Sequence, residues 1–355
     1  MDWVTIDGSL GEGGGQVVRT SLALSAVTGT PVRIHNIRAH RSRPGLAAQH
    51  LAGVEAARAL CGASVSGAQL GSTILSFAPG PIRGGTHAFA VGTAGAATLV
   101  LQVVVPIALH APAPTAVTVN GGTDVPWSPL ADYFDGVFLA HLRRLGVRAT
   151  FEVVHRGFYP KGGGELRLIA EPWVKQAGGE DGIDLTMPGA VERLEVISVA
   201  SEGLAPARVA ERQIAGFERS ADPAWSEARS RCLYARTRSP GTSIHARLVT
   251  DRTVLGVCAL GARGKPAEKV GAEAAELLCN EWASSAATDR WMADQIIPYL
   301  GLRGGTVRTS VVTAHTETNM RVVERFLPVR FGRGEEAATL SAVLSSKPLP
   351  HGGSE

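Results

Sequence analysis

The feature that most constrains this chain is that it repeats one pattern three times. Each copy has a stretch of small residues, a helical segment in which Gln precedes two aliphatic residues, an extended stretch, and a second helical segment. The glutamines are Gln16, Gln102 and Gln295, and the second helical segments are expected to begin near Pro44, Pro129 and Thr318. The similar spacing in the three copies indicates duplication of one structural unit.

Extended stretches rich in Val, Ile and Thr separate these helical segments. Alternating strands and helices favour α/β units in which helices cover a sheet. We therefore predict an α/β (α+β) fold of three repeated units packed around a common pseudo-threefold axis. Pro44 and Pro129 fit a first helical position, and Gly62 and Gly146 fit helix ends.

The region from about 185 to 267 differs in pattern from the repeats. It reads as a strand, an amphipathic helix and three further strands, and we predict an inserted small α/β domain there. The three repeats then occupy 1–184 and 268–345, with the third repeat after the insert. The polar tail 346–355 is expected to be disordered.

Composition excludes several classes of protein. A hydrophobic fraction of 45% and a net charge of +3 exclude a chain that is mainly disordered. We find no run of about 18 apolar residues and therefore expect no membrane span. The acidic, polar N-terminus lacks a secretory signal, and four widely spaced cysteines support neither a disulfide framework nor a cysteine zinc site. These features predict a cytoplasmic protein with free thiols.

Charge is uneven along the chain. Arg38, Arg41 and Arg43 fall within six residues, in a region that has one acidic residue, Glu55, between Gly13 and Thr123. A locally positive surface attracts polyanions. The alternative is a solvated loop whose charge is compensated by acids elsewhere in the fold.

Two glycine-rich segments are candidates for binding phosphate. Residues 11–16 (GEGGGQ) form a turn before a helix, where backbone N–H groups can hold an anion, and Glu12 and Arg19 could face the same cleft. The alternative is a structural turn with a surface ion pair. Residues 156–165 (RGFYPKGGGE) imply a backbone that closely approaches another group. That group is either a ligand phosphate or a helix of a neighbouring repeat.

His315 is the histidine that we single out. It closes the predicted strand TSVVTA and precedes Thr318 and Asn319, which are expected to open a helix. A helix N-terminus favours neutral imidazole and an approaching phosphate, and a neutral ring has one nitrogen free to attack phosphorus. Capping or packing is the alternative role for His315. Trp291 could stack on a base, with Asp294 and Gln295 on a ribose or phosphate, or Trp291 could be core.

Together these motifs resemble the RNA 3′-terminal phosphate cyclase family. The matching stretches run in family order over about residues 6 to 335: DGSLGEGGGQVVR, IRAHRSRPGLAAQHL, GTAGAATLVLQ, GGTDVPWSP, RGFYPKGGGE, RGKPAEKVG, ADQ and HTETN with VVERFLPVRF. The resemblance implies three βαβαββ-type repeats, related to the folding unit of enolpyruvyl transferases, and a small inserted domain.

The resemblance also implies an activity. ATP is the adenylate donor and a divalent ion, Mg²⁺ or Mn²⁺, offsets phosphate charge. His315 matches the nucleophile that takes the adenylate, which passes to an RNA 3′-phosphate and makes an RNA(3′)pp(5′)A end. The neighbouring 2′-OH then closes a 2′,3′-cyclic phosphate and expels AMP.

Site residues follow from the same resemblance by position. Those expected around the adenylate pocket are Gln102, Pro129, Trp291, Met292, Ala293, Asp294 and Gln295, with Glu12, Arg19 and Gln49 around the same cleft. Glu12 is also the candidate metal ligand, and Arg38, Arg41 and Arg43 are candidates for holding the RNA end. Trp291 stands where relatives usually carry Tyr, so stacking is retained while a hydroxyl hydrogen bond is not.

Two alternatives are weighed against the enzyme. Non-catalytic relatives that act in RNA processing or ribosome assembly lack the nucleophilic histidine, so His315 argues against that role. An enolpyruvyl transferase would need about twice as many repeats as the three counted here. The expected partner is RNA with a 3′-phosphate end, without a membrane, and a homodimer is one of the oligomeric states left open.

Overall fold

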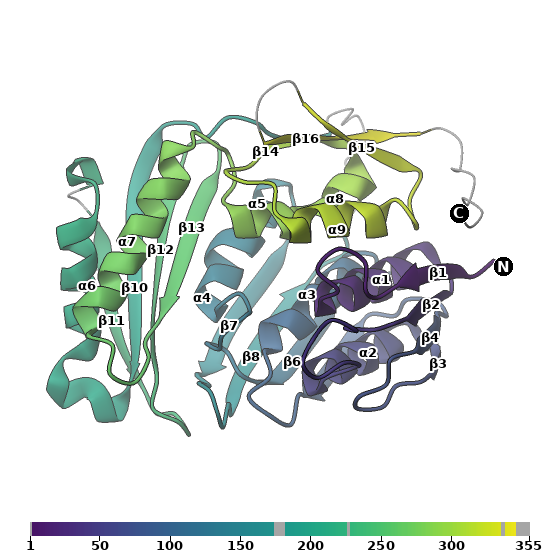
Figure 1. The fold of residues 1–355 in the computed structure, drawn as a ribbon, viewed down its shortest axis with the longest axis horizontal. Coiled ribbons are helices and arrows are strands. Elements are labelled where there is room, and N and C mark those ends of the chain that lie inside the picture. The colour runs from purple at the N-terminus through teal and green to yellow at the C-terminus, as the bar shows by residue number, and fades with distance from the viewer. Residues whose placement is uncertain (1, 174–181, 226–227, 335–337, 346–355) are drawn as a thin grey trace.

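Three four-stranded sheets with one shared strand order form most of the molecule (Figure 1). We obtained a computed structural model, which describes residues 2–173, 182–225, 228–334 and 338–345. In each sheet the first two strands are parallel, and the remaining two join antiparallel, with the last strand in sequence between its neighbours. Recurrence of this order matches the α/β prediction, while the pseudo-threefold axis stays a prediction.

The first unit contains β1 (Val4–Asp7), α1 (Gly15–Thr28), β2 (Val32–His35), α2 (Ala48–Cys61), β3 (Ser64–Ser66) and β4 (Leu75–Ala78). The second contains β5 (Gly85–Ala90), α3 (Ala97–Leu109), β6 (Thr115–Gly121), α4 (Ala131–Tyr133), a π-helical segment η1 (Phe134–Leu139), α5 (Ala140–Arg144), β7 (Ala149–His155) and β8 (Gly164–Ala170). The third contains β9 (Ile183–Leu185), α8 (Arg290–Arg303), β14 (Gly305–Arg308), α9 (Ala314–Val323), β15 (Val329–Arg333) and β16 (Thr339–Leu344).

The inserted domain forms the end of the molecule opposite the first unit (Figure 1). Its elements are β10 (Val191–Ser201), η2 (Glu202–Ala207), α6 (Val209–Ser220), η3 (Pro223–Trp225), β11 (Arg229–Ala235), β12 (Thr242–Thr250), β13 (Val254–Leu260) and α7 (Ala267–Ala283). The sheet order is β11-β10-β12-β13. Its core is separate from the main one and includes Phe217, Ile244 and Leu278.

The contacts of β9 and α7 bear on where the insert, expected from 185 to 267, begins and ends. Strand β9 pairs with β14, so the third unit takes its first strand from before the insert. Helix α7 packs against α6, and a Cβ on Gly271 would lie 1.9 Å from the carbonyl oxygen of Gln213. Because α7 contributes Leu278 to the insert's core, we propose that the inserted domain extends to about Ala283. The expected disordered tail, 346–355, lies outside the described residues.

Three expected helix starts and one strand are wrong. Helix α2 begins at Ala48 and α4 at Ala131, so Pro44 and Pro129 lie in the preceding loops. Helix α9 begins at Ala314, so Thr318 lies one turn inside it. Strand β14 ends at Arg308, and the stretch TSVVTA leads instead into α9, because the Thr313 hydroxyl accepts the backbone N–H of Thr316 as an N-cap. The Gly62 and Gly146 helix ends are confirmed, since both follow helices with positive φ.

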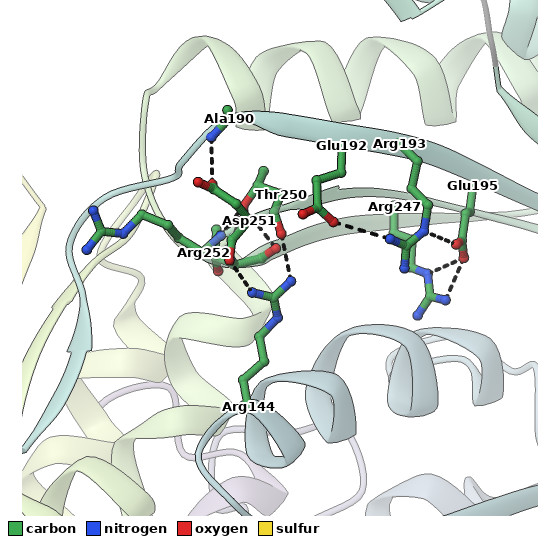
Figure 2. A network of polar contacts seen from close by, with 10 residues as sticks. Arg144, Ala190, Glu192, Arg193, Glu195, Arg247, Thr250, Asp251 and Arg252 are labelled. Atoms are coloured by element: carbon green, nitrogen blue, oxygen red, sulfur yellow. Dashed lines mark hydrogen bonds and ion pairs between the residues drawn. The ribbon is translucent and has the colours of Figure 1, made fainter.

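Partly buried and exposed polar contacts join the insert to the second unit. Figure 2 shows the Arg144 guanidinium of α5 reaching the turn after β12, where it donates to the carbonyls of Thr250 at 2.7 Å and Asp251 at 3.1 Å. Arg247 of β12 donates to the Gly136 carbonyl at 2.7 Å and pairs with Glu195. These bonds hold the inserted domain at a defined place beside η1.

The helices of the three units meet at the centre of the molecule. Helix α1 contacts α2, α3 and α9, and α8 contacts α9 and η1. One continuous core of buried aliphatic and aromatic side chains runs through all three units. Equivalent helices are thereby brought to a common cleft.

Candidate active site

The three repeated glutamines converge on one cleft. Gln16 of α1, Gln102 of α3 and Gln295 of α8 all line it, together with Arg19, Asp294 and others: Thr20, Ala23, Pro106, Phe138, Pro298, Tyr299 and Asn319. The Gln102 side chain donates to Gln295 at 2.8 Å. The glutamine that begins the same short pattern in each of the three units therefore contributes polar groups to one site.

His315 lies at the edge of this cleft, in the first turn of α9 rather than at the end of a strand. Its Nδ1 lies 2.9 Å from Oε1 of Gln16, and its Nε2 lies 2.8 Å from Oε2 of Glu12. Thr318 and Asn319, expected to open the helix, sit one turn further on. Asn319 instead points inward and donates to the Asp294 carbonyl at 2.6 Å.

The hydrogen bonds of Gln16 determine which imidazole nitrogen is protonated. Its amide nitrogen donates to the Asp294 carboxyl at 3.0 Å, so its amide oxygen must face His315. An amide oxygen only accepts, so Nδ1 of His315 carries a proton. The lone pair of the neutral ring is then on Nε2.

Burial lowers the pKa of His315 below its usual value of 6.5, and the cations of Arg19 and Arg41 lower it further against the opposing effect of Glu12. The ring is therefore neutral near pH 7. Nε2 lies 2.8 Å from the carboxylate of Glu12, the group that opposes this lowering of the pKa. Nε2 is available as a nucleophile once that contact opens.

Asp294 and Arg19 form the charged base of the cleft. Burial raises the pKa of Asp294 to about 7, and nearby Asp289 adds to this, while Arg19 opposes it. Burial lowers the pKa of Arg19 to about 10, so it remains a cation facing Asp294. The cleft thus presents a positive group and a carboxyl that accepts from Gln16.

The glycine-rich turn passes directly over His315. A Cβ on Gly14 would lie 3.6 Å from Cε1 of His315 and 3.5 Å from Nη2 of Arg41. A Cβ on Gly15 would lie 2.0 Å from Nε2 of His50, so a larger residue could not occupy the start of α1. Glycine is therefore needed at position 15 to make room for His50, whereas a Cβ at position 14 would make ordinary van der Waals contacts with His315 and Arg41.

The structure separates the three arginines predicted to hold an RNA end. Arg41 reaches the turn, with Nη2 at 3.8 Å from Glu12. Arg38 instead donates to the Gly45 carbonyl at 2.7 Å and supports its own loop. Arg43 is exposed to solvent. Only Arg41 is in contact with the residues around His315.

The predicted adenylate residues fall into two groups. Gln102, Asp294 and Gln295 line the cleft; Trp291 is 37% exposed at the start of α8, under the guanidinium of Arg290. Met292 and Ala293 are fully buried, and Met292 packs in the main core, so their side chains are closed to a ligand. Because it is this exposed, Trp291 is not a residue of the hydrophobic core, which was the alternative role for it.

Pro129 and Gln49 lie outside the lining, near the N-terminus of α3. The Pro129 carbonyl accepts from Thr98 at 2.8 Å, and the side chain of Gln49 accepts the Ala96 N–H at 3.3 Å. Both therefore border the turn that leads into α3.

The second glycine-rich segment serves packing. Arg156 is buried with Asp132, at 2.7 Å, and Asp124, at 3.3 Å. A Cβ on Gly162 would lie 3.0 Å from the Thr93 carbonyl, and one on Gly163 would lie 2.4 Å from Arg238 of the insert. These glycines approach a neighbouring loop and the inserted domain, rather than a helix of another repeat.

Glu12 offers one carboxylate to a metal ion. Within the described ranges, no group of three or more His, Cys, Asp or Glu residues could hold one. A single carboxylate fits Mg²⁺ at a phosphate site, where water and phosphate oxygens supply the other ligands.

From the sequence, Gln16 was predicted as part of the repeated pattern but not as a residue of the active site. The signal that could have found it was present, since Gln102 and Gln295 occupy equivalent positions in their repeats and both were assigned to the pocket. Tyr133 was missed as well. Its hydroxyl donates to Asp289 at 2.7 Å, and Asp289 caps the start of α8.

Comparison with known proteins agrees with this geometry. The family model for RNA 3′-terminal phosphate cyclase matches residues 10–332. A protein of that name from Pyrococcus abyssi is 43% identical over 324 residues, covering 91% of this chain and 93% of its own length. Proteins of the same name from Pyrobaculum neutrophilum and Thermococcus gammatolerans are each 45% identical, covering 92% of this chain and 94% and 93% of theirs.

The chain therefore belongs to the RNA 3′-terminal phosphate cyclase family. Among the described residues, no helix combines the length and the apolar character that crossing a membrane requires.

Proposed function

We propose that the protein is a cytoplasmic, ATP-dependent RNA 3′-terminal phosphate cyclase whose nucleophile is Nε2 of His315. The observation that carries the proposal is the orientation of this ring. Nδ1 is held by Gln16, and Nε2 is directed to the carboxylate beside the glycine-rich turn. Family membership supports the reaction, and the residues around His315 support its first step.

In that first step, Nε2 attacks the α-phosphorus of ATP. A P–N bond forms, the P–O bond to the β-phosphate breaks, and pyrophosphate leaves. The N-terminus of α9, where His315 lies, favours the approach of the phosphate. Arg19 and Arg41, which both act electrostatically on His315, add positive charge for that phosphate.

Two further steps return the enzyme. An RNA 3′-phosphate oxygen attacks the adenylate phosphorus and breaks the P–N bond. The adjacent 2′-OH then attacks the 3′-phosphorus and expels AMP, leaving the 2′,3′-cyclic phosphate. We assign Arg41 and Arg43 to the RNA end, and Glu12 to a divalent ion, which would offset phosphate charge. Arg38 supports the loop that carries Arg41.

We assign the adenosine to the side of the cleft formed by Gln102, Gln295 and Trp291. The two amides can exchange their mutual 2.8 Å bond for bonds to a base edge. The exposed face of the Trp291 ring can stack on that base, with Pro129 nearby at the start of α3.

Incubation with α-labelled ATP and Mg²⁺ tests this function. Wild type is expected to retain label that is acid-labile and alkali-stable, and His315→Ala to retain none. His35→Ala is a matched control, because its side chain is 39% exposed against 44% for His315 and its ring contacts Asp7 instead of Gln16 or Glu12. An unlabelled wild type would contradict the proposal and favour a non-catalytic member of the family.

A further inference from the structure

A fully exposed tryptophan stands near the proposed site. Trp127 is 99% exposed, and its backbone has a φ of 66°, a conformation that bulky residues rarely adopt. Such a residue adds nothing to the core, and strained residues cluster at sites of function. Tyr159 is 68% exposed.

These two aromatic residues project from adjacent loops. The backbone N–H of Thr123 donates to the Gly157 carbonyl at 2.9 Å, and Asp124 and Phe158 form a parallel bridge. Phe158 is buried and fixes its loop, while Tyr159, the next residue, turns outward. Trp127 follows Asp124 by three residues. Two exposed aromatic residues therefore lie on adjoining loops.

Two cations accompany the aromatic pair. The Lys161 N–H donates to the Ser239 hydroxyl at 3.0 Å, which brings the loop to the inserted domain. There Arg238 packs against Gly163. In the part of the chain that the structure describes, neither Lys161 nor Arg238 forms an ion pair, and both are exposed. Their charge is free to meet a polyanion.

A series of contacts links these loops to the glycine-rich turn, since Gly15 of that turn lies against His50, which follows Gln49 in α2. The loop of residues 92–96 lies between them. On one side Gln49 accepts the N–H of Ala96, and on the other Gly162 packs against Thr93 and Ala94. A strand whose 3′ end is at Arg41 could therefore pass over this loop to Lys161 and Arg238.

We propose that Trp127, Tyr159, Lys161 and Arg238 form a platform for the single-stranded nucleotides that precede the RNA 3′ end. The proposal rests on the proposed function, because it uses the same strand. The aromatic rings stack on bases without sequence preference, and the two cations follow the phosphates. The inserted domain, through Arg238, then takes part in holding RNA.

Steady-state cyclisation of two substrates tests the platform. One is a dinucleotide ending in a 3′-phosphate, too short to reach the platform, and the other is a single strand of about 12 nucleotides. For Trp127→Ala with Tyr159→Ala, we expect KM for the longer RNA to rise roughly tenfold or more. KM for the dinucleotide and labelling of the protein by ATP alone should not change.

Trp3→Ala is the matched control, an exposed tryptophan on the first unit that should alter neither KM. Replacing Lys161 and Arg238 with Ala should reduce the salt dependence of binding to the longer RNA. An unchanged KM for the longer RNA, or an equal rise for both substrates, would overturn the platform. Loss of ATP labelling in wild type would instead contradict the proposed function itself.

Discussion

Replacing Gln16 with Met is expected to slow the transfer of adenylate to the enzyme. Met keeps the length of the side chain and removes both hydrogen bonds, the one from Nδ1 of His315 at 2.9 Å and the one to Asp294 at 3.0 Å. A hydrogen bond of this kind contributes about 1 kcal/mol, so the ratio of the tautomer with its lone pair on Nε2 to the other tautomer should fall roughly fivefold. The rate of adenylylation at saturating ATP should fall by up to about this factor.

Single-turnover labelling with α-labelled ATP measures this rate directly. Gln102→Met is the matched control from the equivalent position of the second repeat, where the amide donates to Gln295 instead of contacting His315. It should raise the ATP concentration needed for half-maximal rate and leave the saturated rate nearly unchanged. A saturated rate at the wild-type level in Gln16→Met, in protein with a normal thermal unfolding curve, would refute the role of Gln16.

Three further results are expected. Burial raises the pKa of Asp294 to about 7, so the folded state holds this proton more tightly than the unfolded chain, and wild type loses stability as pH rises from about 4 to 7. The thermal unfolding temperature of Asp294→Asn should therefore fall less than that of wild type across this range. An identical pH profile of the two proteins would exclude the effect. Arg156→Ala leaves two buried carboxylates unpaired and should cost about 3–5 kcal/mol in urea unfolding, against less than about 0.5 kcal/mol for exposed Arg167→Ala. Neutralising Arg41 and Arg43 together should weaken binding of a 3′-phosphorylated RNA and flatten its salt dependence, and an unchanged salt slope would remove both from the RNA path.

The repeated pattern made the order of strands and helices predictable, because each unit carries its own hydrophobic periodicity. Helix starts were less predictable. Pro44 satisfies the local preference for a first helical position, yet α2 begins at Ala48. The loop before it is set by tertiary contacts: Arg38 binds the Gly45 carbonyl, and Gly45 packs against the Gly71 carbonyl. No local signal encodes these.

The candidate site was predictable where residues belong to motifs and less so where geometry decides. His315 and the glycine-rich turn are adjacent, as expected if the turn holds a phosphate that His315 attacks. The basic cluster, in contrast, is one charge pattern with three different environments, since Arg38 binds its own loop, Arg41 reaches Glu12 and Arg43 is exposed. Side-chain direction within a loop depends on packing that the sequence does not display.

The exposure of Trp127 and Tyr159 could not be predicted from the sequence either. Trp127 and Tyr159 belong to motifs of small and polar residues, in which an aromatic residue reads equally well as core. The exposed fractions of Trp127 and Tyr159 show that neither ring is part of the core. Buried Phe158, which bridges to Asp124, precedes Tyr159 in the chain.

The central claim is a covalent bond between Nε2 of His315 and the phosphorus of an adenylate. Brief incubation of the full chain with ATP and Mg²⁺, digestion at neutral to alkaline pH and mass mapping of the peptides test it directly. We predict that a single peptide, the one that contains His315, gains the mass of one adenylyl group (AMP less one water), and that the modification is lost in acid. Attachment of the adenylate to any other residue would contradict the account.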